Sequence, residues 1–147
     1  MEDKLRTVRE LLHQQDVKRA EVVISRLLRT DLTRDQIAEL LALRARAHLL
    51  SANPEQGLKD LLHLQEIAPD TYNEPAVQEI VADCNLARFE LAAIGFTDRT
   101  HLRKAQQIYR ALIDEHPHYE NLGWVMYQYG RSLLAADDVD QAVILFP

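Results

Sequence analysis

The chain has a single cysteine, Cys84, among its 147 residues, so it cannot close an internal disulfide. It also lacks any apolar run that approaches the roughly 18 residues needed to span a bilayer. The first residues, Met1 to Lys4, lack the apolar stretch of a secretory signal. These absences lead us to expect a cytoplasmic protein with no membrane partner.

Glycine is scarce as well, and its positions argue against the usual nucleotide sites. The four glycines, Gly57, Gly95, Gly123 and Gly130, are scattered and form no phosphate-binding loop. Twenty-three acidic residues against seventeen basic ones give a formal charge of −6. Nucleic-acid binding draws mainly on clustered lysine and arginine, so we expect no nucleic-acid partner.

The sequence predicts neither a metal site nor a catalytic centre. The densest histidine cluster, His116 and His118 around Pro117, follows two acidic residues. A structural zinc site uses four ligands, usually from paired Cys or His motifs, and a proline between the histidines favours a turn instead. Cys84 continues an apolar helical series and is expected to be a buried small hydrophobe. We therefore expect no cofactor and no enzymatic activity.

What the chain does have is helical patterning. Its residues are 47% hydrophobic and 27% charged, with few glycines. Thr33 with Gln36 and Asn53 with Gln56 have the spacing of a capping box, and Pro54 suits a first helical position. We predict eight helices, at about residues 3–14, 17–29, 34–51, 54–67, 74–94, 100–115, 120–136 and 139–146.

A repeated step of twelve residues groups these helices into pairs. The step links small residues and prolines in three series: Ala45, Gly57 and Pro69; Ala93, Ala105 and Pro117; Gly130 and Ala142. Small residues allow two helices to cross closely, and a proline after an apolar run marks a helix end. The pattern resembles the tetratricopeptide repeat, in which each repeat is a pair of antiparallel helices.

The resemblance implies an all-α protein whose antiparallel helical hairpins stack as a right-handed solenoid of about four repeats. The hairpins would cover residues 2–30, 34–69, 74–117 and 120–147 of one domain, 1–147, with the last hairpin truncated. That truncation would leave Phe146 exposed and favour self-association through the C-terminal end. A plain helical bundle, with small residues at these places by chance, is the alternative.

The resemblance also implies a function, because such arrays bind other proteins. We expect a non-catalytic interaction scaffold or adaptor that holds a protein or peptide segment in its concave groove. One alternative is the N-terminal targeting or regulatory segment of a larger enzyme or regulator. Another, a helical RNA-binding repeat, is disfavoured by the acidic charge.

Candidate groove residues follow from the same frame. Arginine recurs at the ninth position of three predicted first helices, as Arg9, Arg46 and Arg131. The resemblance implies that this position faces the groove, where guanidinium groups would pair with an acidic segment. Trp124 and Tyr127 would supply an apolar anchor. In the alternative, Trp124 only packs on a neighbouring helix and the arginines are neutralised by Glu2, Glu39 and Glu90.

Overall fold

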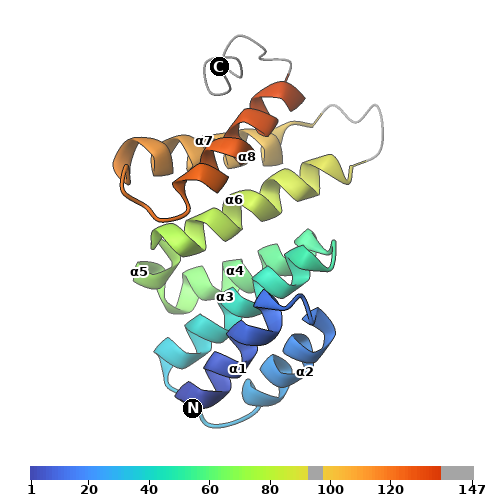
Figure 1. Cartoon of the computed structure of the whole chain (residues 1–147), viewed down its shortest axis with the longest axis vertical. Helices are drawn as coiled ribbons and strands as arrows, with labels where there is room; N and C mark the ends of the chain where they lie inside the picture. The colour runs from blue at the N-terminus through green and yellow to red at the C-terminus, as the bar shows by residue number, and fades with distance from the viewer. Residues whose placement is uncertain (93–97, 137–147) are drawn as a thin grey trace. The chain divides into compact units, whose positions relative to one another are not determined.

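The computed structural model describes residues 1–92 and 98–136, and these residues form eight α-helices (Figure 1). In chain order the helices are α1 (Glu2–His13), α2 (Val17–Leu27), α3 (Arg34–Leu50), α4 (Pro54–Ile67), α5 (Pro69–Tyr72), α6 (Pro75–Glu90), α7 (Thr100–Glu115) and α8 (Leu122–Ala135). The chain divides into two compact units, Met1–Asn73 and Glu74–Pro147, and within each unit the helices pack largely as antiparallel neighbours. The predicted all-α class is confirmed.

Seven of the predicted helices are present, two of them, 54–67 and 100–115, with the predicted bounds and the others with ends that differ by one to four residues. The largest difference is in α6, which was predicted to run over 74–94 and ends at Glu90. The eighth predicted helix, 139–146, lies outside the described residues, as do the predicted exposure of Phe146 and the small positions Ala93 and Ala142.

Pro69 begins a helix that was not predicted. α4 ends at Ile67, as its apolar run indicates, but Pro69 then occupies the first position of the four-residue helix α5. The ring that cannot continue one helix fits the start of the next, because a first helical position needs no backbone N–H. Pro117, in contrast, follows α7 without starting another helix, as predicted.

One of the two predicted capping boxes is confirmed. The Gln36 backbone N–H donates to Thr33 Oγ1 at 3.2 Å, and the Thr33 N–H donates to Gln36 Oε1 at 3.0 Å. The second box was wrong, since Asn53 caps no backbone N–H of α4 within the described chain. Ala52 has a φ of 57°, and Asn53 has a ψ of 61° where Thr33 has the extended 162°, so the Asn53 side chain does not lie over the helix end.

The core of the first unit comes from the apolar faces of α1, α2 and α3. Its buried residues recur at spacings of three and four along α1 and α2, which places them on one side of each helix. Full burial of each large aliphatic side chain contributes about 1.5–3 kcal/mol. The buried cluster contains Leu5, Val8, Leu12, Ala20, Ile24, Leu27, Leu40 and Ala47.

The second unit has a core of its own, between α6, α7 and α8. Tyr109 is its largest fully buried side chain. The buried cluster contains Ala82, Leu86, Leu102, Ala105, Tyr109, Leu112 and Val125. Cys84 is also fully buried on α6, as predicted from its place in an apolar series.

The small residues of the twelve-residue series that fall in the described ranges are all buried: Ala45, Gly57, Ala105 and Gly130. Burial at these places is what close helix crossing requires, while the repeat itself stays a prediction. No helix in residues 1–92 and 98–136 is long and apolar enough to cross a membrane.

Candidate functional site

The structure places the five predicted site residues in both units. Arg9 lies on α1 and Arg46 on α3, in the first unit, whereas Trp124, Tyr127 and Arg131 all lie on α8, in the second. The three arginines are thus divided between the two units, and the arginine column across the groove stays a prediction. The three residues on α8 can be examined as one surface.

Trp124 and Tyr127 form an exposed aromatic pair on α8. Their ring centroids lie 5.6 Å apart at an interplanar angle of 34°, and the side chains are 48% and 49% exposed. Arg131 and the half-exposed Leu134 follow on the same helix at spacings that keep them on the same side. We call these four residues the α8 surface. From Trp124 to Leu134 it extends about 15 Å along the helix axis, at 1.5 Å per residue.

A buried carboxylate on α6 holds the Trp124 side chain in place through a hydrogen bond. Asp83 of α6 is only 7% exposed, and its Oδ2 accepts a hydrogen bond from Trp124 Nε1 at 3.0 Å. Its Oδ1 accepts one from the Tyr109 hydroxyl and one from Gln128 Nε2, the latter at 3.3 Å. Burial of a carboxylate is unfavourable unless donors surround it. Three helices thus supply one network, and Trp124 is both bonded to α6 and half exposed.

The same network holds Arg131. Arg131 Nη1 donates to Gln128 Oε1 at 2.7 Å, and Nη2 forms an ion pair with Glu90 of α6. A chain of polar contacts therefore joins Glu90, through Arg131 and Gln128, to Asp83. This ion pair is the expected neutralisation of Arg131 by Glu90. A partner's carboxylate would have to compete with Glu90 for the Arg131 guanidinium.

Burial and Asp83 also set the protonation of Tyr109. Burial in the core raises the pKa of the Tyr109 hydroxyl far above its ordinary value, and the negative charge of Asp83 and the hydrogen bond to it act in the same direction. The hydroxyl therefore remains a donor at all physiological pH values. Asp83 therefore keeps the Tyr109 hydroxyl as a donor near neutral pH.

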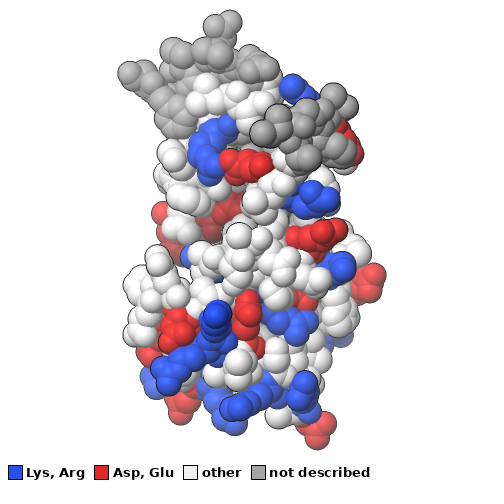
Figure 2. Space-filling model, turned by 90° about the vertical axis from the view of Figure 1, so that its right-hand side faces the viewer, with Lys and Arg blue, Asp and Glu red and all other residues white. Residues whose placement is uncertain are grey.

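In the first unit, Arg9 is neutralised in the same way. It forms ion pairs with Glu2 at 3.3 Å and with Glu39. Arg46 is exposed, and among the described residues no ion pair involves it. Figure 2 shows that, on the face it presents, acidic and basic side chains are interspersed over the first unit in the lower part of the view.

A second polar network joins three helices of the first unit. Arg44 of α3 binds Asp60 of α4 through two hydrogen bonds, Nε to Oδ2 at 2.9 Å and Nη2 to Oδ1 at 2.8 Å. The hydrogen bond to Asp60 raises the pKa of Arg44 against the opposing effect of burial. His48 of α3 is partly buried, with Nδ1 3.7 Å from Glu21 and Nε2 3.5 Å from Asp60.

The sequence analysis missed the two buried carboxylates that organise these networks. Asp83 interrupts an apolar stretch, Val81-Ala82-Asp83-Cys84, whereas Asp60 follows Lys59. An acidic residue inside an apolar helical run is the signal that could have marked Asp83. It could not have named the donors, because these come from other helices.

No three His, Cys, Asp or Glu side chains in residues 1–92 and 98–136 are grouped so that they could hold a metal ion. Comparison with models of protein families, with curated proteins and with solved structures finds no match to this chain. The candidate site therefore rests on its own geometry.

Proposed function

We propose that the protein is a tetratricopeptide-like, non-catalytic interaction module that binds a segment of a partner protein through the α8 surface. The observation that carries the proposal is the exposed Trp124 and Tyr127 pair, with Trp124 held by the buried Asp83. Tryptophan, tyrosine and arginine are the residue types most enriched at binding hot spots. All three occur together on one helix face.

The second support is rigidity. A side chain that is already fixed before binding loses little conformational freedom when a partner covers it. Trp124 is anchored by a charge-assisted hydrogen bond, and Arg131 is held by Gln128 and Glu90. The arrangement is therefore a preorganised contact surface in which Arg131 lies between the aromatic pair and Leu134.

The third support concerns the hairpins. Successive helices within each unit pack as antiparallel neighbours, and small residues of the twelve-residue series are buried. Both features favour a stack of tetratricopeptide-like hairpins, whose rigid surface would present the concave groove to a partner. Arg9 and Arg46 would contribute to that groove in the complete stack.

Comparative affinity capture tests the proposal. The parent, a Trp124→Ser/Tyr127→Ser variant and a Leu62→Ser control are immobilised in equal amounts and exposed to lysate of the cells in which the protein occurs. Leu62 is a suitable control because it is a large apolar residue of α4 that is 58% exposed. We expect a set of proteins retained by the parent and the control and lost from the double variant. The same set on all three would contradict the proposal, once circular dichroism shows that all are folded.

A further inference from the structure

The outer face of α2 and the turn that follows it carry cations that form no ion pair in the described residues. Lys18, Arg26 and Arg29 are exposed, and within residues 1–92 and 98–136 no ion pair involves any of them. This differs from Arg44 and Arg131, each of which is paired with a carboxylate. The charges on α2 therefore remain available to an outside group.

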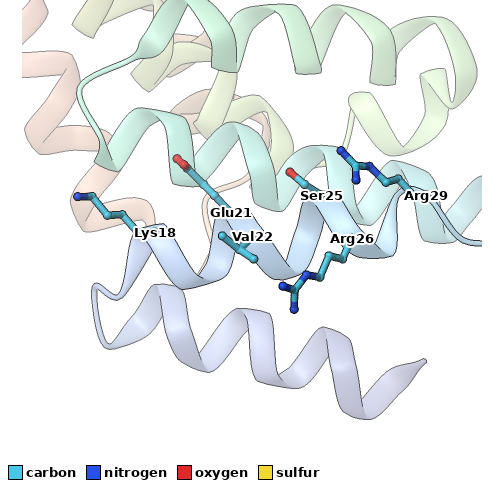
Figure 3. Close-up of a pocket in the computed structure, with 6 residues that line it drawn as sticks. All are labelled: Lys18, Glu21, Val22, Ser25, Arg26 and Arg29. Atoms are coloured by element: carbon cyan, nitrogen blue, oxygen red, sulfur yellow. The ribbon is translucent and has the colours of Figure 1, made fainter.

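These cations line a hollow of about 550 Å³ on α2. The other lining residues are Glu21, Val22 and Ser25, and all six except Arg29, which follows the end of α2, belong to that helix (Figure 3). Val22 is 50% exposed and lies four residues after Lys18 and four residues before Arg26. The face thus has positive ends and an apolar centre. We call it the α2 face.

The one carboxylate of the α2 face is already engaged elsewhere. Glu21 Oε1 accepts a hydrogen bond from Ser51 Oγ at 3.2 Å and lies 3.7 Å from His48 Nδ1, both on the side of α3. Three cations against this single acid make the face locally positive, although the whole chain has a net charge of −6.

Helix stability accounts for Arg26, which lies in the last turn of α2 where the helix dipole favours a cation, but not for Lys18. The first turn of α2 contains no acidic residue and includes Lys18, although the positive end of the helix dipole favours acids there. Arg29 follows Arg26 by three residues, just beyond the end of α2, and like charges repel each other. An external anion would relieve both unfavourable terms.

We infer that the α2 face binds an acidic peptide segment of a partner protein, with carboxylates at Lys18 and at Arg26 and Arg29 and an apolar side chain on Val22. Lys18 and Arg26 lie about 12 Å apart along the axis of α2, which an extended peptide of about four residues spans. A peptide can place apolar and acidic groups in turn, as this face requires. A continuous row of phosphates would meet Val22 and Glu21 at its centre. The α2 face belongs to the first unit, so the inference does not rest on the α8 surface.

Fluorescence anisotropy with a labelled peptide, Glu-Glu-Ser-Leu-Ser-Glu-Glu, tests the inference on the full chain. We expect saturable binding that weakens as salt rises from about 50 to 200 mM, because salt screens exposed charges. Arg26→Gln/Arg29→Gln should weaken binding about tenfold or more. The matched control, Arg103→Gln/Lys104→Gln, removes two exposed cations from α7 and should bind as the parent does.

Further measurements separate the contribution of the apolar contact at Val22 from that of charge. Val22→Ser should weaken binding of the leucine peptide several-fold and leave a peptide with serine at its centre unaffected. The inference is overturned if the parent shows no saturable binding, if the α7 control loses as much affinity as the α2 variant, or if a glutamine version of the peptide binds equally well. Stronger binding to poly-uridylate RNA, to vesicles of anionic lipid or to inorganic phosphate than to the acidic peptide would overturn it as well.

Discussion

Asp83 is the residue on which the geometry of the α8 surface depends. It is buried in the second unit and accepts hydrogen bonds from α7 and from two residues of α8. Both oxygens of a carboxylate accept hydrogen bonds, which suits these three donors. An amide at this position would turn its NH₂ group toward at least one of the donors. The carboxylate therefore links the stability of the unit to the orientation of its exposed tryptophan.

Asp83→Asn tests that link. We expect a loss of about 1–3 kcal/mol in the free energy of unfolding, because at least one buried donor is left without its charged acceptor. Trp124 is the only tryptophan, so a fall in its steady-state anisotropy reports its release. Asp114→Asn, at an exposed ion pair of α7, is the control and should change stability by less than about 0.5 kcal/mol. Parental stability and anisotropy in Asp83→Asn would refute the role assigned to Asp83.

Tyr109 is expected to make the second unit less stable at alkaline pH. Burial and Asp83 raise the pKa of its hydroxyl, whereas a tyrosine in the unfolded chain ionises near pH 10. The stability contributed by the protonated, buried form is fully present below about pH 10 and is lost as the pH rises above that value. We expect the free energy of unfolding of the parent to fall more steeply above about pH 10 than that of Tyr109→Phe. Urea titrations at a series of pH values measure both slopes, and equal slopes would contradict the prediction.

At the scale of single elements, local signals predicted most of the helices. Prolines, the Thr33 cap and apolar spacing located seven helices to within a few residues, because helix ends are set by the few backbone groups near them. Helix α5 was missed because a proline that ends one helix also suits the start of another. The exposure of Trp124 and Tyr127 was predictable from helical periodicity, but their support by Asp83 was not. That support depends on which helices meet in space.

The two glycines of α8 are expected to respond in opposite ways. A Cβ at Gly123 would meet no atom within 4 Å, so Gly123→Ala should raise the free energy of unfolding by about 0.5–1 kcal/mol through higher helix propensity. Gly130 is buried, and Gly130→Leu should lower it by about 1–3 kcal/mol through overpacking. Thermal melts followed by circular dichroism measure both changes. If Gly130→Leu melts at the parental temperature, the close helix crossing assigned to Gly130 is wrong.

At the scale of the whole molecule, each unit combines a buried apolar cluster with a different kind of exposed surface. The first unit carries the unpaired cations of the α2 face, and the second carries the aromatic α8 surface. The net charge of −6 indicates no general affinity for polyanions, yet it conceals the local positive charge on α2. The distribution of charge on each helix therefore says more about the class of partner than the net charge of the whole chain does.

The most direct test of the account is the affinity of a captured partner for the α8 surface, measured by isothermal titration calorimetry. Trp124→Ala and Tyr127→Ala should each weaken binding by about 2 kcal/mol or more, roughly thirtyfold, as hot-spot residues do. Tyr127→Ala leaves the Trp124 and Asp83 hydrogen bond in place, so it separates partner contact from loss of that support. Leu62→Ala should bind as the parent does. Parental affinity in both aromatic variants, with their helical circular dichroism intact, would contradict the proposed function.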